Sequence, residues 1–192
     1  IIIKGGPGTG KSVIAINLMA DLLNKDINAH YVTGSKAFTE TLRTAIGTRS
    51  GPQFKYFNSY TKAKYNSVDV MIADEAHRIR VNSHSRFTPK AERTDRSQVN
   101  ELLETSKVAV FFLDDDQVVR PNEIGSAAYI KEAAQALNCD VHEYELEAQF
   151  RCSGSEAFVN WINNTLAIKK TANILWNGEE EFDFQIVDSP HT

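Results

Sequence analysis

The stretch GGPGTGKS, residues 5–12, follows an apolar run at the start of the chain and precedes a segment with helical periodicity. The pattern G-x-x-x-x-G-K-[ST] between a strand and a helix is typical of a phosphate-binding loop. Its glycines allow backbone N–H groups to curl around an anion, and the helix N-terminus adds its positive dipole. We therefore predict that this loop binds the phosphates of ATP, with Lys11 at the β- and γ-phosphates and Ser12 as a Mg²⁺ ligand. The predicted nucleotide contacts are Gly5, Gly6, Pro7, Gly8, Thr9, Gly10, Lys11, Ser12 and Val13.

Apolar, strand-like runs alternate with helical segments along the rest of the chain. Several of the runs are continuously apolar, as in parallel sheets that are buried on both faces. This alternation predicts an α/β fold of the P-loop NTPase type, in which helices cover both faces of a parallel sheet and ligands bind at the carboxyl ends of the strands. The predicted strands are 1–4, 29–33, 54–57, 68–73, 107–113 and 141–146. The predicted helices are 11–24, 36–46, 97–106, 126–138 and 154–166.

The composition is that of an ordinary globular protein of 192 residues, 42% of them hydrophobic, which is enough to bury a full core. The net charge of -4 argues against nucleic-acid binding through bulk charge, although it leaves a local basic patch open. Cys139 and Cys152 have no second pair, so neither a disulfide framework nor a zinc site is indicated. No apolar stretch is long enough to span a membrane, and we expect a cytoplasmic protein without a membrane partner.

The stretch VMIADEAHR, residues 70–78, ends a buried strand with Asp74 and Glu75. In a P-loop protein the first acid holds Mg²⁺, and an adjacent Glu can activate the attacking water. We therefore predict Asp74 as a metal-linked acid and Glu75 as the catalytic base. Two roles are open for His77, which either couples the nucleotide state to neighbouring loops or is a hydrogen-bonded structural residue.

The stretch VAVFFLDDDQ, residues 108–117, runs from six apolar residues into three aspartates without an intervening lysine or arginine. Like charges at a strand end repel one another, so they need cations or hydrogen-bond donors unless they form a solvated turn. If this strand lies near those that carry Lys11 and Asp74, the charges of Mg²⁺ and the lysine compensate the acids. Gln117 would then hydrogen-bond the γ-phosphate or the attacking water, and we predict it as a catalytic residue.

In this order, GGPGTGKS, DEAHR, LDDDQ and LEAQFR resemble motifs I, II, III and IV of superfamily 1 helicases. DEAHR together with DDDQ is most similar to the Schlafen-type (group 3-like) helicase domain of bacterial proteins. The resemblance covers roughly residues 1–165 and implies a RecA-like sheet. It also implies that Arg151, in QFR, points its guanidinium at the γ-phosphate, a planar donor that suits transition-state charge.

The stretch YVTGSK, residues 31–36, takes the place of motif Ia, which contacts single-stranded nucleic acid in the family that the chain resembles. A basic irregular segment at 78–97 follows the second motif and is longer than most loops. We therefore expect single-stranded DNA or RNA as a partner. The candidate contacts are Thr33, Ser35, Lys36, Asn58, Ser59 and Tyr60, of which Tyr60 could stack on a base.

No stretch resembles the glutamine motif that reads adenine or the motifs V and VI of a second motor domain. We expect residues 1–166 to form a RecA-like motor domain and residues 167–192 to begin a truncated second one. The leading hypothesis is the ATP-binding and ATP-hydrolysing half of a helicase-like motor, which hydrolyses ATP slowly by itself. The alternative is a nucleotide-dependent switch that binds protein partners and no nucleic acid.

Overall fold

The computed structural model describes residues 1–47, 50–84, 88–90, 93–117, 120–147, 156–168, 170–171 and 189. Its internal contacts divide the chain into two units. The first consists of residues 1–6 and 10–147, and the second of residues 7–9 and 148–192.

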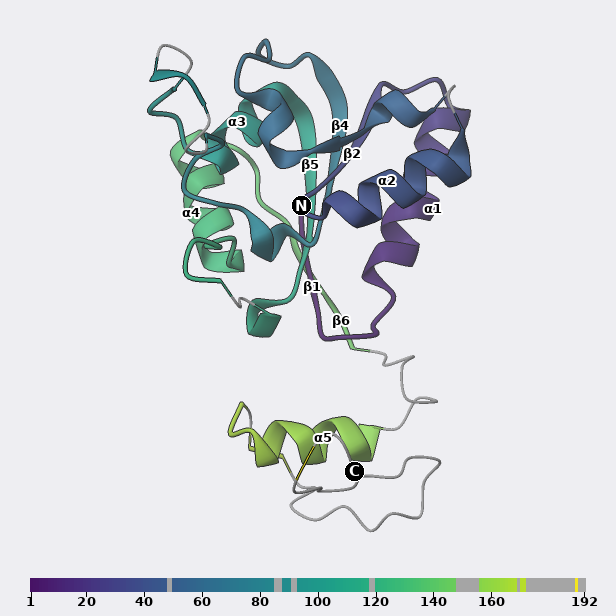
Figure 1. Cartoon of the computed structure of the whole chain (residues 1–192), viewed down its shortest axis with the longest axis vertical. Helices are drawn as coiled ribbons and strands as arrows, with labels where there is room; N and C mark the ends of the chain where they lie inside the picture. The colour runs from purple at the N-terminus through teal and green to yellow at the C-terminus, as the bar shows by residue number, and fades with distance from the viewer. Residues whose placement is uncertain are drawn as a thin grey trace. The chain divides into compact units, whose positions relative to one another are not determined.

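The first unit is built on a six-stranded sheet in which every neighbouring pair of strands is parallel. The strands follow the order β3-β2-β4-β5-β1-β6, so β5 lies between β4 and β1 (Figure 1). This arrangement confirms the predicted α/β fold, a RecA-like P-loop sheet. The strands are β1 (Ile2–Gly5), β2 (Ala29–Thr33), β3 (Phe54–Tyr56), β4 (Val68–Asp74), β5 (Ser106–Leu113) and β6 (Glu143–Leu146).

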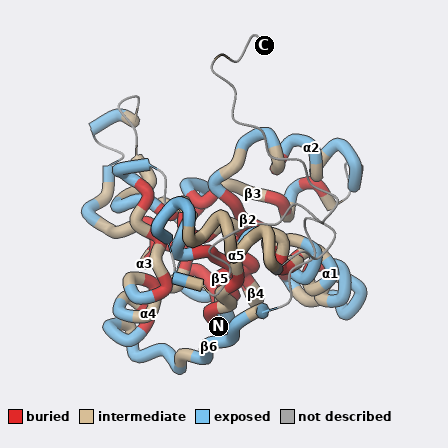
Figure 2. Tube along the Cα trace, turned by 90° about the horizontal axis from the view of Figure 1, so that it is seen from below, coloured by how far each residue is buried: buried red, intermediate tan, exposed pale blue. Residues whose placement is uncertain are grey.

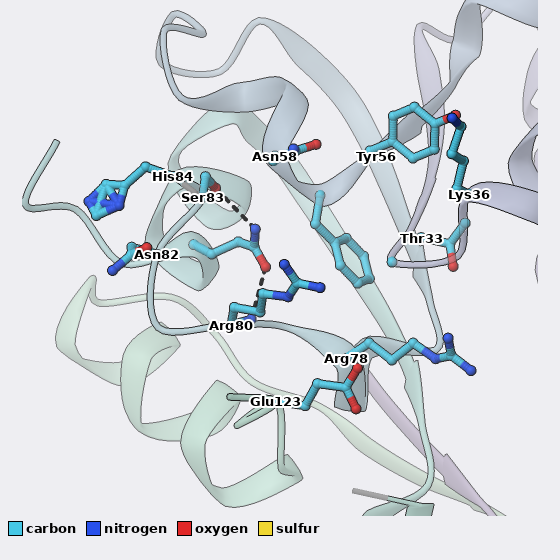
Figure 3. Close-up of a pocket in the computed structure, with 13 residues that line it drawn as sticks. Thr33, Lys36, Tyr56, Asn58, Arg78, Arg80, Asn82, Ser83, His84 and Glu123 are labelled. Carbon is cyan, nitrogen blue, oxygen red and sulfur yellow. Dashed lines mark hydrogen bonds between the residues drawn. The ribbon is translucent and has the colours of Figure 1, made fainter. Parts of the chain in front are cut away.

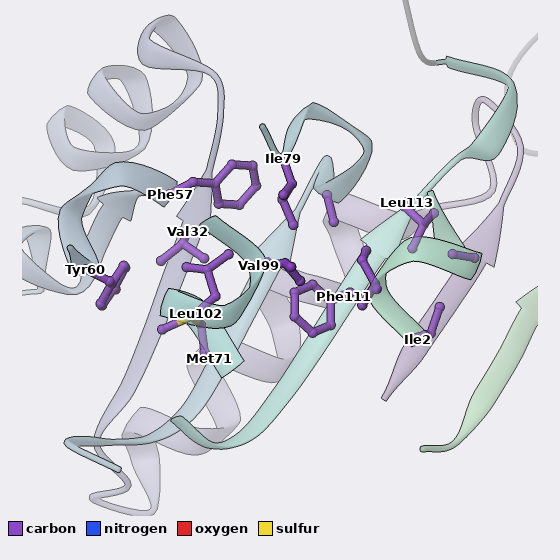
Figure 4. Close-up of a cluster of buried hydrophobic side chains, with 14 of the residues drawn as sticks. Ile2, Val32, Phe57, Tyr60, Met71, Ile79, Val99, Leu102, Phe111 and Leu113 are labelled. Atoms are coloured by element: carbon purple, nitrogen blue, oxygen red, sulfur yellow. The ribbon is translucent and has the colours of Figure 1, made fainter. Parts of the chain in front are cut away.

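Helices cover both faces of the sheet, as predicted. The helices α1 (Lys11–Asn24) and α2 (Lys36–Ile46) pack on one face, where Met19 contributes to a buried cluster with residues of the strands (Figure 1). The helices α3 (Gln98–Thr105) and α4 (Ala127–Ala136) pack on the other. There Leu102 belongs to a second buried cluster, drawn in Figure 4. Figure 2 shows that buried positions concentrate in the strands.

Local sequence signals explain where these helices begin. The side chains of Ser35, Ser97 and Ser126 cap α2, α3 and α4, since each hydroxyl accepts a hydrogen bond from a backbone N–H in the first turn. The element ends differ from the predicted ones by at most two residues, as at α4, which ends at Ala136, and β6, which begins at Glu143. Within the described ranges, no helix is both long and apolar enough to cross a membrane.

The segment after β5 folds back onto the segment after β4. The backbone N–H of Ile124 donates to the carbonyl oxygen of Ile79 at 2.7 Å, and Arg80 forms an antiparallel bridge with Glu123. Gly125 lies so close to the segment after β4 that a Cβ atom at this position would overlap the carbonyl oxygen of Ala76. Glycine is therefore required at this position.

In the second unit the structure describes α5 (Glu156–Thr165), close to the helix predicted at 154–166. Asn164 fixes the chain after this helix, because its Nδ2 donates to the carbonyl oxygen of Thr171 at 2.9 Å and its Oδ1 accepts from the Thr171 N–H at 3.0 Å. The predicted domain boundary at residue 166 stays a prediction.

Candidate active site

Three strands that carry predicted site residues are neighbours in the sheet. The strand β5 lies between β1 and β4, and all three strands are parallel. Their carboxyl ends, at Gly5, Asp74 and just before Asp114, therefore lie side by side at the same end of the sheet. The prediction that the strand before Asp114 lies near the strands of Lys11 and Asp74 is confirmed. Carboxyl ends of adjacent parallel strands are where α/β proteins bind ligands.

The loop after β1 has the backbone that its glycines predict. Gly8 and Gly10 adopt left-handed φ angles of 80° and 83°. Lys11 is 7% exposed, and its Nζ donates to the carbonyl oxygens of Gly5 at 2.6 Å and Gly6 at 2.8 Å. The N-cap of α1 is Gly10, and no side chain caps this helix, in contrast to α2, α3 and α4. A helix N-terminus without a side-chain cap is a typical place for a phosphate to bind.

Asp74 lies at the centre of a buried hydrogen-bond cluster and is 0% exposed. Its Oδ2 accepts from the hydroxyl of Ser12 at 2.7 Å and from the hydroxyl of Tyr31 at 2.6 Å. Its Oδ1 accepts from the N–H of Glu75 at 3.0 Å. The structure therefore brings together the two predicted Mg²⁺ ligands, Ser12 and Asp74.

Tyr31 is a site residue that was not predicted from the sequence. This residue belongs to β2, the neighbour of β4, and is 1% exposed. Burial, followed by the charge of Asp74, raises the pKa of Tyr31 well above its usual range. The phenol consequently stays a neutral O–H donor to the carboxylate. The contact of Tyr31 with Asp74 depends on the pairing of β2 with β4, and the sequence of β2 alone does not predict that pairing.

Glu75 follows Asp74 in a left-handed conformation with φ 55° and ψ 42°, which is strained for a residue with a side chain. Its Oε2 lies 3.1 Å from the Nε2 of His77 and 3.5 Å from the Nε of Arg78. The hydrogen bond from His77 is the largest cause that lowers the pKa of Glu75, and burial opposes it. Nearby Arg78 and Lys11 add to the lowering, so the carboxylate is ionised at neutral pH.

His77 joins the ends of two strands. It is 1% exposed, and its Nδ1 accepts from the backbone N–H of Asp114 at 3.4 Å. Its Nε2 is therefore the nitrogen that carries the proton and donates to Glu75. Of the two roles left open for His77, the hydrogen-bonded structural one agrees with these contacts. A role in coupling the nucleotide state stays a prediction.

Two of the three aspartates after β5 have local hydrogen-bond donors as partners, which corrects the prediction that Mg²⁺ and lysine compensate the acidic end as a whole. Asp114 is 4% exposed, and its Oδ2 accepts from the Nε2 of Gln117 at 2.8 Å. Its Oδ1 accepts from the N–H of Asp116 at 3.1 Å. Asp115 caps α4, since its Oδ1 accepts from the N–H of Ala127 at 2.8 Å. Local N–H donors thus compensate Asp114, which is buried, and Asp115, which is solvent-exposed like Asp116.

Three of the six predicted nucleic-acid contacts, Thr33, Lys36 and Asn58, line one cavity of about 310 Å³ at the ends of β2 and β3 (Figure 3). Side chains of the segment after β4, among them Arg80, form the opposite wall. The sequence shows that this segment is basic, but Arg80 is not among the predicted contacts. The full lining is Thr33, Gly34, Lys36, Tyr56, Phe57, Asn58, Arg78, Arg80, Asn82, Ser83, His84, Gln98 and Glu123.

The other three candidates have structural roles. The hydroxyl of Ser35 caps α2, and the hydroxyl of Ser59 accepts from the N–H of Tyr56 at 3.2 Å. Tyr60 is 3% exposed within the core, and its hydroxyl lies 2.9 Å from the Nδ1 of His30. The prediction that Tyr60 stacks on a base is wrong, because its ring is not accessible. Arg151 lies outside the described residues.

The family model for the Schlafen group 3 DNA/RNA helicase domain matches residues 1–192. The chain belongs to this family. No curated protein matches this chain. Among solved structures it is similar to Pif1 of Bacteroides sp. in complex with ADP-AlF4, with 13% identity and a TM-score of 0.44. The match covers 85% of the Schlafen-type domain, which spans 41% of the length of that Pif1 chain.

Proposed function

We propose that this domain binds MgATP and hydrolyses it, as the nucleotide-binding half of a helicase-like motor that acts on single-stranded DNA or RNA. The observation that carries the proposal is the cluster at adjacent strand ends. The ammonium of Lys11 donates to the carbonyl oxygen of Gly5 in the loop, and the hydroxyl of Ser12 donates to Asp74. Glu75 directly follows Asp74 in the chain. Membership of a helicase-domain family supports the choice of nucleic acid as the partner.

The residues present suit Mg²⁺ and a triphosphate. The hydroxyl of Ser12 and the carboxylate of Asp74 are hard oxygen ligands 2.7 Å apart, which is the kind of donor that Mg²⁺ prefers. When bound, Mg²⁺ neutralises charge that develops on the phosphates. With nucleotide bound, Lys11 would hold phosphate oxygens in place of its two carbonyl partners. Ser12 and Asp74 would hold Mg²⁺, and the hydrogen bond from Tyr31 would keep the Asp74 carboxylate oriented.

Glu75 is the general base that accepts a proton from the attacking water. Its ionised state at neutral pH fits this role, and His77 fixes the direction of its carboxylate. Gln117, at the end of β5, binds the γ-phosphate or orients the water once its amide leaves Asp114. Arg151 is proposed to stabilise charge on the γ-phosphate.

A helicase-like site is completed by a second motor domain, whose donors stabilise the developing phosphate charge. The domain alone is therefore expected to bind nucleotide and hydrolyse it slowly. Strand movement requires two domains that close and open on the strand. We propose a location in the cytoplasm for this activity.

Single-turnover hydrolysis tests the proposal with Glu75→Gln. The amide cannot accept a proton at neutral pH, so MgATP binding persists and hydrolysis falls by orders of magnitude. Glu132→Gln is the matched control, because Glu132 is exposed on α4 and should retain the wild-type rate. Wild-type hydrolysis by Glu75→Gln would place the base elsewhere.

The same assay is run on the protein that includes the second motor domain, with single-stranded DNA, with single-stranded RNA and without a strand. Strands accelerate ATP hydrolysis by a motor, whereas hydrolysis by a protein-binding switch responds only to its protein partner. Hydrolysis that no strand accelerates would contradict the motor.

A further inference from the structure

One carboxylate, that of Glu123, lies among basic side chains in the cavity of about 310 Å³ at the ends of β2 and β3 (Figure 3). The lysine and arginines that line the same cavity are Lys36, Arg78 and Arg80. In a chain with a net charge of -4, this local excess of positive charge favours an anionic ligand. A carboxylate in the same wall repels an anion, unless the ligand also carries a hydrogen-bond donor next to its charge.

The carboxylate of Glu123 is buried and accepts no hydrogen bond in the part of the chain that the structure describes. Its side chain is 5% exposed, and its Oε1 lies 3.9 Å from the Nε of Arg120, which is too far for a hydrogen bond. Arg120 is 64% exposed, so solvent weakens this ion pair. A buried carboxylate without a donor is costly, and such groups are usually satisfied by a residue, a water or a ligand. A ligand of the cavity that offers a donor would satisfy Glu123.

Backbone contacts hold Glu123 beside Arg80. The two residues form an antiparallel bridge, and the partners in such a bridge carry their side chains on the same face. The N–H of Glu123 donates to the carbonyl oxygen of Arg120 at 3.0 Å. The N–H of Arg80 donates to the Oε1 of Gln98 at 2.9 Å, and Gln98 is 3% exposed at the start of α3. Because protein contacts fix both backbones, binding does not have to order them.

A cation beside a carboxylate matches a pair of neighbouring groups in RNA. The 2′-hydroxyl of each ribose is a donor on the carbon next to the one that carries the 3′-phosphate. DNA has the same phosphate without the hydroxyl, and the 2′-hydroxyl is the group by which a protein distinguishes the two at a given site. In dinucleotide-binding folds, likewise, an acidic side chain hydrogen-bonds the ribose 2′-hydroxyl.

We propose that Glu123 selects RNA over DNA in this cavity, by accepting a hydrogen bond from the 2′-hydroxyl of a nucleotide whose phosphate Arg80 and Lys36 bind. Toward DNA the same carboxylate offers only repulsion of the phosphate. Glu123 is then a specificity-determining residue, and RNA is the strand on which the motor acts. The selectivity rests on the proposed function, which supplies a single strand as the ligand.

Strands that differ only at the 2′ position test the selectivity. Fluorescein-labelled oligomers of uridine, 2′-deoxyuridine and 2′-fluoro-2′-deoxyuridine, all of one length, are titrated with the 192-residue chain, and anisotropy gives the affinities. The bases and phosphates are identical, so their contributions cancel in the affinity ratios, and the fluoro strand keeps the sugar pucker of RNA without a donor. The uridine strand should bind at least about tenfold more tightly than the other two, because only it donates to the ionised Glu123. Equal affinity of the uridine strand and either other strand would overturn the proposal.

The variant Glu123→Ala should lose the selectivity through a weaker affinity for the uridine strand alone. Its affinity for the deoxyuridine strand should stay the same or rise, because a negative charge is removed from the cavity. Glu132→Ala is the matched control, since Glu132 is exposed on α4, and it should keep the wild-type ratio. A Glu123→Ala protein that binds both strands more weakly by the same factor has an unchanged ratio, and that result overturns the role of Glu123.

The variant Glu123→Gln decides the question if thermal unfolding shows that Glu123→Ala does not fold. Its amide keeps the shape and an acceptor oxygen, but a neutral acceptor forms a bond roughly half as strong, so the ratio of the two affinities should fall to about its square root. A wild-type ratio in Glu123→Gln would overturn the proposal.

The selectivity and the proposed function fail in different ways. A wild-type chain that binds none of the strands refutes nucleic acid as the partner, and with it both the proposed function and the selectivity. A chain that binds all three strands with equal affinity agrees with the proposed function and overturns the selectivity of Glu123.

Discussion

Replacing Tyr31 by Phe removes one hydroxyl from the interior and tests the support of Asp74. The hydroxyl donates to the Asp74 carboxylate at 2.6 Å, and Asp74 is 0% exposed, so water cannot replace the donor without a rearrangement. A hydrogen bond to a charged group contributes about 1.5–3 kcal/mol. Because the ring stays in place, we expect the free energy of unfolding to fall by that amount, which lowers Tm by about 3–12 °C in a domain of this size.

The variant should also bind MgATP about tenfold or more weakly, because a residue that orients a metal-bound carboxylate typically has such an effect. ATP affinity in the presence of EDTA should change little. Thermal unfolding and calorimetric titration measure the two effects, with Tyr65→Phe as the control, since Tyr65 is 76% exposed. A Tyr31→Phe protein with the Tm and magnesium dependence of the control would refute the view that Tyr31 supports Asp74.

Three further predictions concern stability, each measured by thermal unfolding. Gly125→Ala should destabilise the protein by at least about 1–3 kcal/mol through backbone overlap, whereas Gly51→Ala should not, because its added Cβ meets only an ordinary contact; equal Tm values would contradict the close approach. Burial lowers the pKa of His30 from 6.5 to about 4, so the unfolded chain binds a proton that the folded one does not, and stability should fall as pH drops from 6.5 to 4. A His30→Gln variant whose stability falls as steeply over that range would refute this assignment. Asp115→Ala should cost about 0.5–2 kcal/mol through the lost cap on the Ala127 N–H, and an unchanged Tm would show that the cap is dispensable.

The local motifs of the sequence predicted most of the fold. The loop at residues 5–12 fixed the first strand and helix, and the apolar runs that end at Asp74 and Leu113 gave two central strands. That these two strands are neighbours in the sheet was predicted only because a P-loop protein brings its charged strand ends together at one site. The local donors to Asp114 and Asp115 were not predicted, because they depend on how the chain turns after β5 and returns to α4.

The errors in the site arise from contacts between segments that are distant in sequence. Tyr31 lies within β2 and Tyr60 in the turn after β3, and both are buried. The hydroxyl of Tyr31 supports Asp74 and that of Tyr60 lies beside His30, and only the packing of β2 and its neighbours distinguishes the two roles. Ser35 is different, because a serine directly before a helix is a recognisable cap in the sequence. That signal could have removed it from the nucleic-acid candidates.

Calorimetric titration of the 192-residue chain with MgATP tests most directly whether the loop at residues 5–12 and the strand ends beside it form a nucleotide site. Lys11→Ala removes the buried ammonium that the Gly5 and Gly6 carbonyl oxygens hold in the loop, while Lys25→Ala removes an exposed one at the far end of α1. The wild type and Lys25→Ala should bind MgATP with equal affinity, and Lys11→Ala should bind it at least about tenfold more weakly, as the loss of a charge-assisted phosphate contact requires. Equal affinity for all three proteins, or no binding by the wild type, would contradict the assignment of this site.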